Sequence, residues 1–359
     1  MTVLSILSAI LLLAILIVVH EFGHFLAARL MKIDVTEFSV GFGPKLFGWK
    51  SKKYETNFSV RLIPLGGYCA FFGEDDAKGI TREDPRAFPN HSVWKRLFTI
   101  LMGPLMNLIL AFLVAAAFFW VNGAERVTGV DPYIAEVMAA GPAHSAELQA
   151  GDVIEQINGQ DMLDGTMDTL SGTISGWKEG NAPLHLTIRR GEETLERDLV
   201  PVWDAEEGKM RIGVILGGRY RTETDPVGFL DGFRRSGEWC VTAGGAILNA
   251  LKNLVTTGEG LDQTSGPVGI VSIVSEEVRT GGFSAFIQLL VLISINLGLM
   301  NPLPIPGLDG SRLIFCLIEA IRGKPVPPEK EAIVHLVGMV FLFGVMIFFT
   351  FRDVIRLFH

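Results

Sequence analysis

Hydrophobic residues gather in four long runs along this chain. Each run contains at least 18 consecutive positions without an Asp, Glu, Lys or Arg. Because about 20 apolar residues in helical form cross the core of a bilayer, these runs predict four membrane-spanning helices. We expect the first helix to extend over residues 1–30, and the third to lead into a proline-rich segment, over residues 283–310. The four runs are residues 2–19, 97–121, 283–300 and 332–351.

Composition supports a membrane protein that also carries a water-exposed domain. The chain has 359 residues, 49% of them hydrophobic, and a mean hydropathy of +0.38. The first run does not resemble a cleaved signal peptide, because no Lys or Arg precedes it and a polar cluster stands where cleavage would occur. The net charge of −8 gives no reason to expect nucleic-acid binding.

Basic residues predict the orientation of the chain. Twelve Lys and Arg residues stand between positions 29 and 96, and four more between 312 and 330. We therefore expect the loops at residues 31–96 and 311–331 to be cytoplasmic. The N-terminus and residues 122–282 would then lie outside, and residues 352–359 would form a short tail. The long external segment has 13 basic and 25 acidic residues, which agrees with this orientation without deciding it.

The first cytoplasmic loop contains an apolar β-element. Residues 57–63 alternate as a strand, residues 64–67 form a turn, and residues 68–72 are predicted to pair back on the first strand. The preceding residues 40–44 are rich in turn-forming residues. Two alternatives remain for this hairpin. It is either a small ordinary β-element, or it dips toward the membrane and offers an edge for strand addition.

Residues 122–202 have the mixed pattern of a soluble α/β domain. The dipeptide Asn158-Gly159 predicts a tight hairpin turn. The run from Ala140 to Gly159 resembles the helix-turn-strand signature of PDZ domains, which accept an extended peptide as an added strand. This resemblance implies one PDZ domain with a peptide ligand. The predicted elements are a short helix at residues 146–150 and strands at residues 133–137, 153–157, 184–189 and 195–202.

Residues 203–282 complete the external segment as predicted helices and linker. Between positions 226 and 257, large apolar residues are interspersed with Arg234, Arg235 and Lys252, which is typical of one or two amphipathic helices. Such helices lie on the outer membrane surface or pack against the soluble domain, and both alternatives fit the pattern. The cysteines at positions 69, 240 and 316 are isolated in sequence, which predicts free thiols.

Three ionisable residues occur at the end of the first run, in the motif His20-Glu21-Phe22-Gly23-His24. Ionisable side chains within a bilayer or at its edge are costly, and they usually have a function. Histidines at positions i and i+4 share one helix face, and a glutamate between them can reach a water at a metal held by that face. The spacing predicts His20 and His24 as zinc ligands and Glu21 as a general base. The alternative is that the histidines only pack between helices.

A catalytic zinc site needs a third protein ligand and an open position for water. The segment Asn301-Pro-Leu-Pro-Ile-Pro-Gly-Leu-Asp-Gly310 follows the third run, and its prolines cannot sustain a helix. Unwound backbone at the membrane face persists only where it is buried in protein or lines a wet cavity. The first run ends at the same face, so Asp309 is the candidate third ligand, with an ordinary Asp-Gly turn as the alternative. His335 has no second ligand beside it and is better explained by packing or hydrogen bonding.

Together these motifs resemble the bacterial site-2 proteases, a family of intramembrane zinc metalloproteases, and above all the branch of the regulator-of-sigma-E protease. Two departures stand out. The best-known members carry two tandem PDZ domains, whereas this chain has room for one, and Ser311-Arg312 stands where many relatives have Gly-His or Gly-Arg. The resemblance covers nearly the whole chain and rests on an ordered set of motifs: HEFGH, Gly103-Pro-Leu-Met-Asn107, the PDZ signature, Ser265-Gly-Pro-Val-Gly-Ile270 and NPLPIPGLDG.

The resemblance implies that Zn2+ is held by His20, His24 and Asp309, with Glu21 as the general base. It implies that residues 54–72 form the family's membrane-associated β-hairpin, and that the active site lies near the cytoplasmic face of the bacterial inner membrane. It also implies substrate contacts. The implied substrate-binding residues are Asn301 and, from the hairpin pattern RxxPxGGY, Arg61, Gly66, Gly67 and Tyr68, with Pro64 completing the pattern.

The predicted fold is a polytopic α-helical membrane protein with about four transmembrane helices, a membrane-associated β-hairpin and one inserted α+β PDZ domain. The expected function is zinc-dependent cleavage of transmembrane segments. Expected substrates are single-span proteins already trimmed outside, such as anti-sigma factors, or signal-peptide remnants. One alternative is a PDZ scaffold with a structural metal, which would want a fourth protein ligand. A zinc transporter is a second alternative, but four spans with one acidic ligand make a poor pathway.

Overall fold

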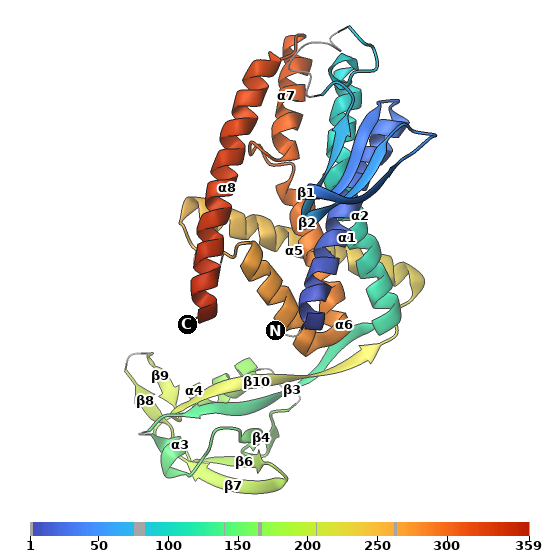
Figure 1. Cartoon of the computed structure of the whole chain (residues 1–359). Coiled ribbons are helices and arrows are strands. Elements are labelled where there is room, and N and C mark those ends of the chain that lie inside the picture. Colours follow the sequence, from blue (N-terminus) through green and yellow to red (C-terminus); the bar gives the residue numbers. More distant parts are fainter. Residues whose placement is uncertain are drawn as a thin grey trace. The chain divides into compact units, whose positions relative to one another are not determined.

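A computed structural model describes residues 3–74, 83–139, 141–163, 167–205, 207–261 and 264–358 (Figure 1). The chain divides into two compact units, and each is described by itself. Unit 1 consists of Met1–Val121 and Gly228–His359, and unit 2 consists of Asn122–Val227. The HEFGH motif and the proline-rich segment both belong to unit 1.

Among the described residues, four helices are long and apolar enough to cross a membrane, in agreement with the four that the sequence predicts. The third of them begins earlier than predicted, at Pro267. Its first part is a separate helical stretch that meets the second part at a kink at Gly282, where φ is +62°. Glycine adopts this left-handed conformation without strain. The four helices are α1 (Val3–Leu30), α2 (Val93–Asn122), α6 (Pro267–Met300) and α8 (Pro328–Phe358).

Helix α6 packs against both α1 and α2. It thereby connects the two chain segments of unit 1, the one before unit 2 and the one after it. Small side chains on α1 and α2 allow the close approach of these helices. A single amphipathic helix, α5 (Phe229–Thr256), packs against the same group. The contacts between α1 and α6 involve Ala9, Leu12, Leu16, Val274 and Leu290, and those between α2 and α6 involve Ala111, Ala115, Val291 and Ile295.

The β-hairpin is larger than predicted and has a different strand order. It consists of β1 (Val35–Lys50) and β2 (Asn57–Phe71), which pair antiparallel. Residues 37–40 have partners on both sides, in residues 67–70 and in residues 57–60. The predicted pairing of residues 57–63 with residues 68–72 is therefore wrong, because a third segment lies between them.

The bend within β1 occurs at two glycines. Gly41 and Gly43 have φ values of +93° and +81°, in the region that glycine favours. The turn signal at residues 40–44 is thus real, but it marks a bend inside one long strand. The predicted hairpin of residues 54–72 is too short for the same reason, since its partner strand begins at Val35.

A small apolar core joins the base of the hairpin to three helices at one end of unit 1. It includes the C-terminal part of α1, the start of α2 and helix α7 (Asp309–Arg322). Arg96 of α2 forms an ion pair with Glu319 of α7. This end of unit 1 therefore holds the hairpin, the HEFGH helix and the helix that begins at Asp309 together. The buried residues of the core are Ala28, Ile33, Val35, Cys69, Phe71, Phe88, Ile100, Leu313 and Cys316.

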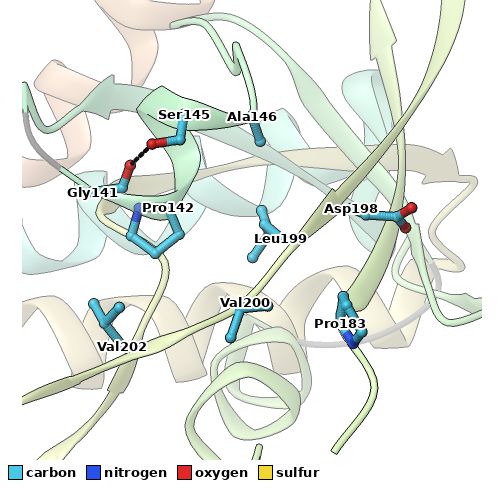
Figure 2. Close-up of a pocket in the computed structure, with 9 residues that line it drawn as sticks. All are labelled: Gly141, Pro142, Ser145, Ala146, Pro183, Asp198, Leu199, Val200 and Val202. Atoms are coloured by element: carbon cyan, nitrogen blue, oxygen red, sulfur yellow. Dashed lines mark hydrogen bonds between the residues drawn. The ribbon is translucent and has the colours of Figure 1, made fainter.

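Unit 2 is built on a six-stranded sheet with strand order β10-β3-β4-β6-β7 and a short β5 beside β4. Its core contains fully buried Ile134, Ile154 and Leu186. A pocket of about 610 Å³ is lined mainly by residues in and beside α3 and by the end of β7 with the residues after it (Figure 2). The elements are β3 (Ala124–Val137), α3 (Pro142–Ser145), β4 (Val153–Ile157), β5 (Gln160–Asp161), α4 (Met167–Ser175), β6 (Leu184–Arg190), β7 (Glu193–Leu199), β8 (Val202–Asp204), β9 (Lys209–Arg211) and β10 (Val214–Asp225).

Two predictions for this unit are wrong. The helix predicted at residues 146–150 lies earlier, because Pro142 favours a helix start and Glu147, with φ +56°, cannot continue one. The unit also continues beyond residue 202, where helices and linker were expected. The segment instead forms three strands, of which β10 pairs with β3 from Val214 to Asp225. This pairing joins residues far apart in sequence and leaves no local pattern.

Candidate metal centre

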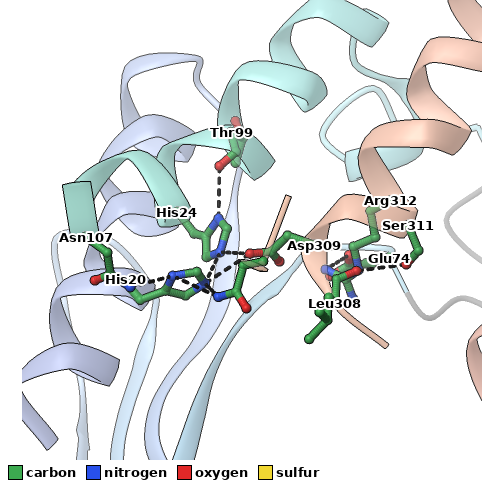
Figure 3. A network of polar contacts seen from close by, with 10 residues as sticks. His20, His24, Glu74, Thr99, Asn107, Leu308, Asp309, Ser311 and Arg312 are labelled. Carbon is green, nitrogen blue, oxygen red and sulfur yellow. Dashed lines mark hydrogen bonds and ion pairs between the residues drawn. The ribbon is translucent and has the colours of Figure 1, made fainter. Parts of the chain in front are cut away.

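Two histidines of α1 point toward the same place (Figure 3). His20 and His24 lie one helical turn apart, and their Nε2 atoms are separated by 3.3 Å. Their rings meet edge to face, with centroids 4.9 Å apart. Both side chains are buried. The i, i+4 spacing thus brings two imidazoles together within an apolar helix, as the sequence predicts.

The third group of the centre comes from the other end of the chain. Helix α6 ends at Met300, and a tight loop leads to Asp309 at the start of α7. The amide of Gly310 donates to the carbonyl of Asn301 at 2.7 Å, and a Cβ at position 310 would collide with the carbonyl of Leu303. This loop places Asp309 Oδ2 3.0 Å from His20 Nε2 and 3.4 Å from His24 Nε2.

The three groups fit a zinc ion. Bonds of about 2.0–2.1 Å at tetrahedral angles separate neighbouring ligand atoms by about 3.3–3.4 Å. The three separations between His20, His24 and Asp309 are 3.0, 3.3 and 3.4 Å. Two imidazoles and one carboxylate are a donor set of catalytic zinc sites, which leave a fourth position open. Within the described ranges, no other group of three His, Cys, Asp or Glu side chains converges in this way.

Helix α2 contacts the Nδ1 atom of both histidine rings. His24 Nδ1 lies 3.0 Å from the carbonyl oxygen of Thr99 and donates to it, which leaves Nε2 free to bind a metal. The side-chain amide of Asn107 lies 3.3 Å from His20 Nδ1. One helix therefore contacts the outer nitrogen of both rings (Figure 3).

Glycines bring α1 and α2 into close contact at this point. A Cβ at Gly103 would collide with the ring of His24, and a Cβ at Gly23 would collide with the carbonyl oxygen of Met102. Any larger residue at either position would separate the helices or move the ring. The first glycine of the Gly103-Pro-Leu-Met-Asn107 motif is thus explained by the space that His24 needs.

We expect Gly103→Ala to lower zinc affinity by at least tenfold. The added methyl group occupies the place of the His24 ring, and disturbance of an outer support of a ligand already costs about 10–100-fold. Competition with a chromophoric chelator measures the change in the purified protein. Gly344→Ala in α8 is the matched control, because a Cβ there meets no atom within 4 Å. Equal zinc affinity in both variants would contradict this account of Gly103.

The hairpin contacts α1 beside Glu21. A Cβ at Gly67 would lie 2.8 Å from Ile17 Cγ2 and 3.1 Å from Glu21 Cγ. Gly66 packs against the ring of Phe42, and a Cβ there would collide with it. The Glu21 side chain is buried. Strand β2 therefore passes directly along the part of α1 that carries the candidate general base.

Arg61 and Tyr68 contact other hairpin residues. Arg61 donates to Glu37 Oε1 at 2.8 Å, to Ser39 Oγ at 3.1 Å and to the carbonyl of Gly43 at 2.8 Å. Burial opposes ionisation of Glu37, but hydrogen bonds led by that of Arg61 hold its pKa below the usual range. The Arg61 guanidinium also lies 5.5 Å from the centre of the Tyr68 ring. These contacts brace the bend of β1.

Asn301 lies at the metal centre, with Nδ2 3.4 Å from both ring nitrogens of His20. Sequence reasoning missed the role of Thr99, since its contribution is a backbone oxygen and carries no residue-type signal. It also missed the ion pair between Arg312 Nη1 and Glu74 Oε1, at 2.8 Å, which ties the first turn of α7 to the segment after β2 (Figure 3). Arg312 lies three residues after Asp309, and this is the only sequence signal for it.

The remaining candidates have other surroundings. His335 lies 3.4 Å from Ser311 Oγ and contacts Phe315 edge to face, in agreement with a packed, hydrogen-bonded residue. Cys69, Cys240 and Cys316 are free thiols, as predicted.

Known proteins share this sequence along almost its full length. The sequence pattern of peptidase family M50 matches residues 8–345. A protein of Agrobacterium fabrum named as a candidate zinc metalloprotease is 35% identical over 96% of this chain and 94% of its own. One of Clostridium acetobutylicum with the same designation is 34% identical over 99% of this chain and 98% of its own. The regulator of sigma-W protease RasP of Bacillus subtilis is 32% identical over 99% of both chains.

The matched region contains all three groups of the metal centre. The coverage of the relatives is nearly complete in both directions, so the similarity extends beyond a shared motif. The predicted family, enzyme class and metal are thereby confirmed. This chain belongs to peptidase family M50, the family of the site-2 proteases, and is a zinc metalloprotease.

Proposed function

We propose that this protein cleaves peptide bonds within the membrane-spanning segments of other membrane proteins. His20, His24 and Asp309 would hold the zinc, and Glu21 would act as the general base. One observation supports this most. Two of the three converging groups belong to α1, a helix long and apolar enough to cross a membrane. Ionisable groups in such a helix are costly unless they serve a function there.

The mechanism follows from the residues around the centre. Zinc bound there would polarise the scissile carbonyl and make water acidic enough to lose a proton near neutral pH. Glu21 follows His20 in the chain and is buried, so its carboxylate would take this proton and deliver it to the leaving amine. Asn301, whose amide lies beside His20, would orient the substrate backbone by hydrogen bonding.

A substrate helix must become extended before it is cleaved, because its carbonyl groups are bonded within the helix. The hairpin supports such a step. Residues 67–71 pair with residues 35–40, and Gly67 lies against α1 beside Glu21. We infer that an extended substrate segment adds to this part of the hairpin. Large apolar side chains on the hairpin suit contact with lipid; the exposed ones include Phe42, Leu46, Phe47, Trp49 and Leu62.

We expect Gly67→Ala to lower the cleavage rate by about 100-fold without changing zinc affinity. The added methyl group pushes β2 away from Ile17 and Glu21, and displacements of about 1 Å can cost that much. Rates on a model substrate and zinc competition measure the two effects separately. Val60→Ala, at an exposed position of the same strand, is the control. A normal cleavage rate in Gly67→Ala would rule out the contact as part of the substrate path.

We further propose that unit 2 is a PDZ domain on the outer side of the membrane. The helix-turn-strand signature within its sequence, its two helices and its edge strand β10 support this. Such a domain would dock the trimmed end of a substrate as an added strand. The excess of Lys and Arg in residues 31–96 supports a cytoplasmic loop there, and hence a metal centre near the cytoplasmic face.

The proposed substrates are single-span membrane proteins that have already been trimmed outside. Anti-sigma factors and signal-peptide remnants are two such classes. The relative from Bacillus subtilis supports the first class, since its name describes a regulator of sigma-W.

Purified protein in lipid vesicles with a single-span model substrate tests the function. We expect products whose new termini lie within the hydrophobic segment by mass spectrometry, loss of cleavage with a chelator, and recovery with zinc. Cleavage only outside that segment would contradict intramembrane proteolysis. Peptide binding and retained zinc without any cleavage would favour the scaffold alternative. Zinc flux into the vesicles would favour the transporter.

A further inference from the structure

Asn107 of α2 is fully buried next to the metal centre, with an incomplete set of hydrogen bonds. Its Oδ1 has no hydrogen-bond partner among the described residues, and its Nδ2 lies 3.3 Å from His20 Nδ1. A buried carbonyl oxygen without a donor is costly. As placed, the Asn107 side chain turns its nitrogen to His20 and leaves its oxygen without a donor (Figure 3).

His20 has the complementary need. A histidine that binds a metal through Nε2 carries its ring proton on Nδ1, and this proton requires an acceptor. An amide nitrogen cannot accept it, because both groups are donors. Exchange of Oδ1 and Nδ2 by a half-turn of the amide changes the shape of the side chain very little. After this exchange, one hydrogen bond satisfies both His20 Nδ1 and Asn107 Oδ1.

Asn301, the other side chain near His20 Nδ1 among the described residues, does not offer this acceptor. Asn301 Nδ2 is 3.4 Å from both Nδ1 and Nε2 of the ring, so it lies beside the ring and along neither N–H direction. The second histidine has such an acceptor, because His24 Nδ1 donates to the Thr99 carbonyl. Asn107 is on the same helix as Thr99 and meets the equivalent nitrogen.

We propose that Asn107 is a positioning residue of the metal centre, whose amide oxygen accepts the Nδ1 proton of His20 and so presents Nε2 to the zinc. The proposal rests on His20 being a ligand. It assigns a role to the last residue of the Gly103-Pro-Leu-Met-Asn107 motif. The main chain at this residue is also anchored, because Ser294 Oγ donates to the Asn107 carbonyl at 2.7 Å.

Two substitutions of nearly equal size test the direction of this hydrogen bond. Asn107→Leu removes the acceptor and is expected to weaken zinc binding by about 10–100-fold in chelator competition. Asn107→Asp offers only acceptor oxygens and is expected to stay within about threefold of the wild type. If the amide nitrogen were instead the group that His20 needs, Asn107→Asp would be as damaging as Asn107→Leu. That result, or failure of Asn107→Asp to fold, would overturn the proposal.

The visible spectrum of the Co2+-substituted protein gives a second readout that packing alone would not move. Its ligand-field bands are expected to shift in Asn107→Leu and to match the wild type in Asn107→Asp. Ser236→Ala is the control and should match the wild type, since it removes a buried hydrogen bond to the Phe112 carbonyl of the same helix without touching Asn107 or His20. Unchanged bands and affinity in Asn107→Leu would contradict the positioning role. His20→Ala tests the ligand set on its own, apart from the role of Asn107. If this variant keeps full zinc affinity, the proposed ligand set is wrong.

Discussion

Replacing Glu21 by Gln is expected to abolish cleavage and to leave zinc binding unchanged. The amide has almost the shape of the carboxylate, but it cannot take a proton from water. Loss of a general base costs about 100- to 10,000-fold in rate. The proposed zinc ligands His20, His24 and Asp309 do not include Glu21, so chelator competition should give the wild-type affinity. Cleavage of a single-span substrate in vesicles measures the activity.

Loss of cleavage with retained zinc would distinguish an enzyme from a non-catalytic scaffold that binds the same metal. Glu277→Gln, at an exposed position of α6, is the matched control and should cleave at the wild-type rate. Undiminished cleavage by Glu21→Gln would remove this residue from the mechanism. Loss of zinc together with activity would instead assign Glu21 a part in building the site.

Asp309→Asn is expected to lose both zinc and cleavage. The neutral amide is a weak ligand, and His20 and His24 alone leave the ion two protein contacts. The drop in affinity should exceed the roughly 10–100-fold that follows from loss of an outer support. The loop itself should persist, because its hydrogen bond joins the Gly310 amide to the Asn301 carbonyl. Zinc content by mass spectrometry and chelator competition measure the effect.

A buried aspartate elsewhere in unit 1 provides the control for this substitution. Asp353 of α8 accepts hydrogen bonds from the amides of Gly266 and Gly269, each at 2.8 Å, and has no part in the metal group. Asp353→Asn should keep its zinc, whatever it does to thermal stability. An Asp309→Asn protein with full zinc occupancy would end the proposal that Asp309 is the third ligand.

The parts of the structure that sequence reasoning could predict depend on local regularities. A run of 18 or more residues without charge predicts a spanning helix whatever surrounds it. The spacing of His20 and His24 places them on one helix face by geometry alone. Asp309 could be predicted for a different reason. The prolines before it interrupt the helix at the membrane face where the first span is also expected to end.

The parts that could not be predicted depend on residues far apart in the chain. The alternation in residues 57–63 and 68–72 correctly predicts extended backbone, which the structure joins into the one strand β2, but it contains no information that residues 37–40 pair with both parts. The support of His24 comes from a backbone oxygen of Thr99, and every residue type has one. Asn107 stood out in the sequence as a polar residue of an apolar helix and as the last residue of a family motif, but only its distance to His20 shows which group it contacts.

The pairing of β3 with β10 has a consequence for how such proteins diversify. Ala124 pairs with Asp225, so the chain enters and leaves unit 2 at points about 5 Å apart. Because unit 2 is attached through this one pair of strands, it can be lengthened, duplicated or exchanged while the helices before and after it keep their separation. The alignment with RasP extends over 432 positions, against 359 residues in this chain, so the family tolerates added length. Unit 2 and the metal centre of unit 1 can therefore evolve at different rates.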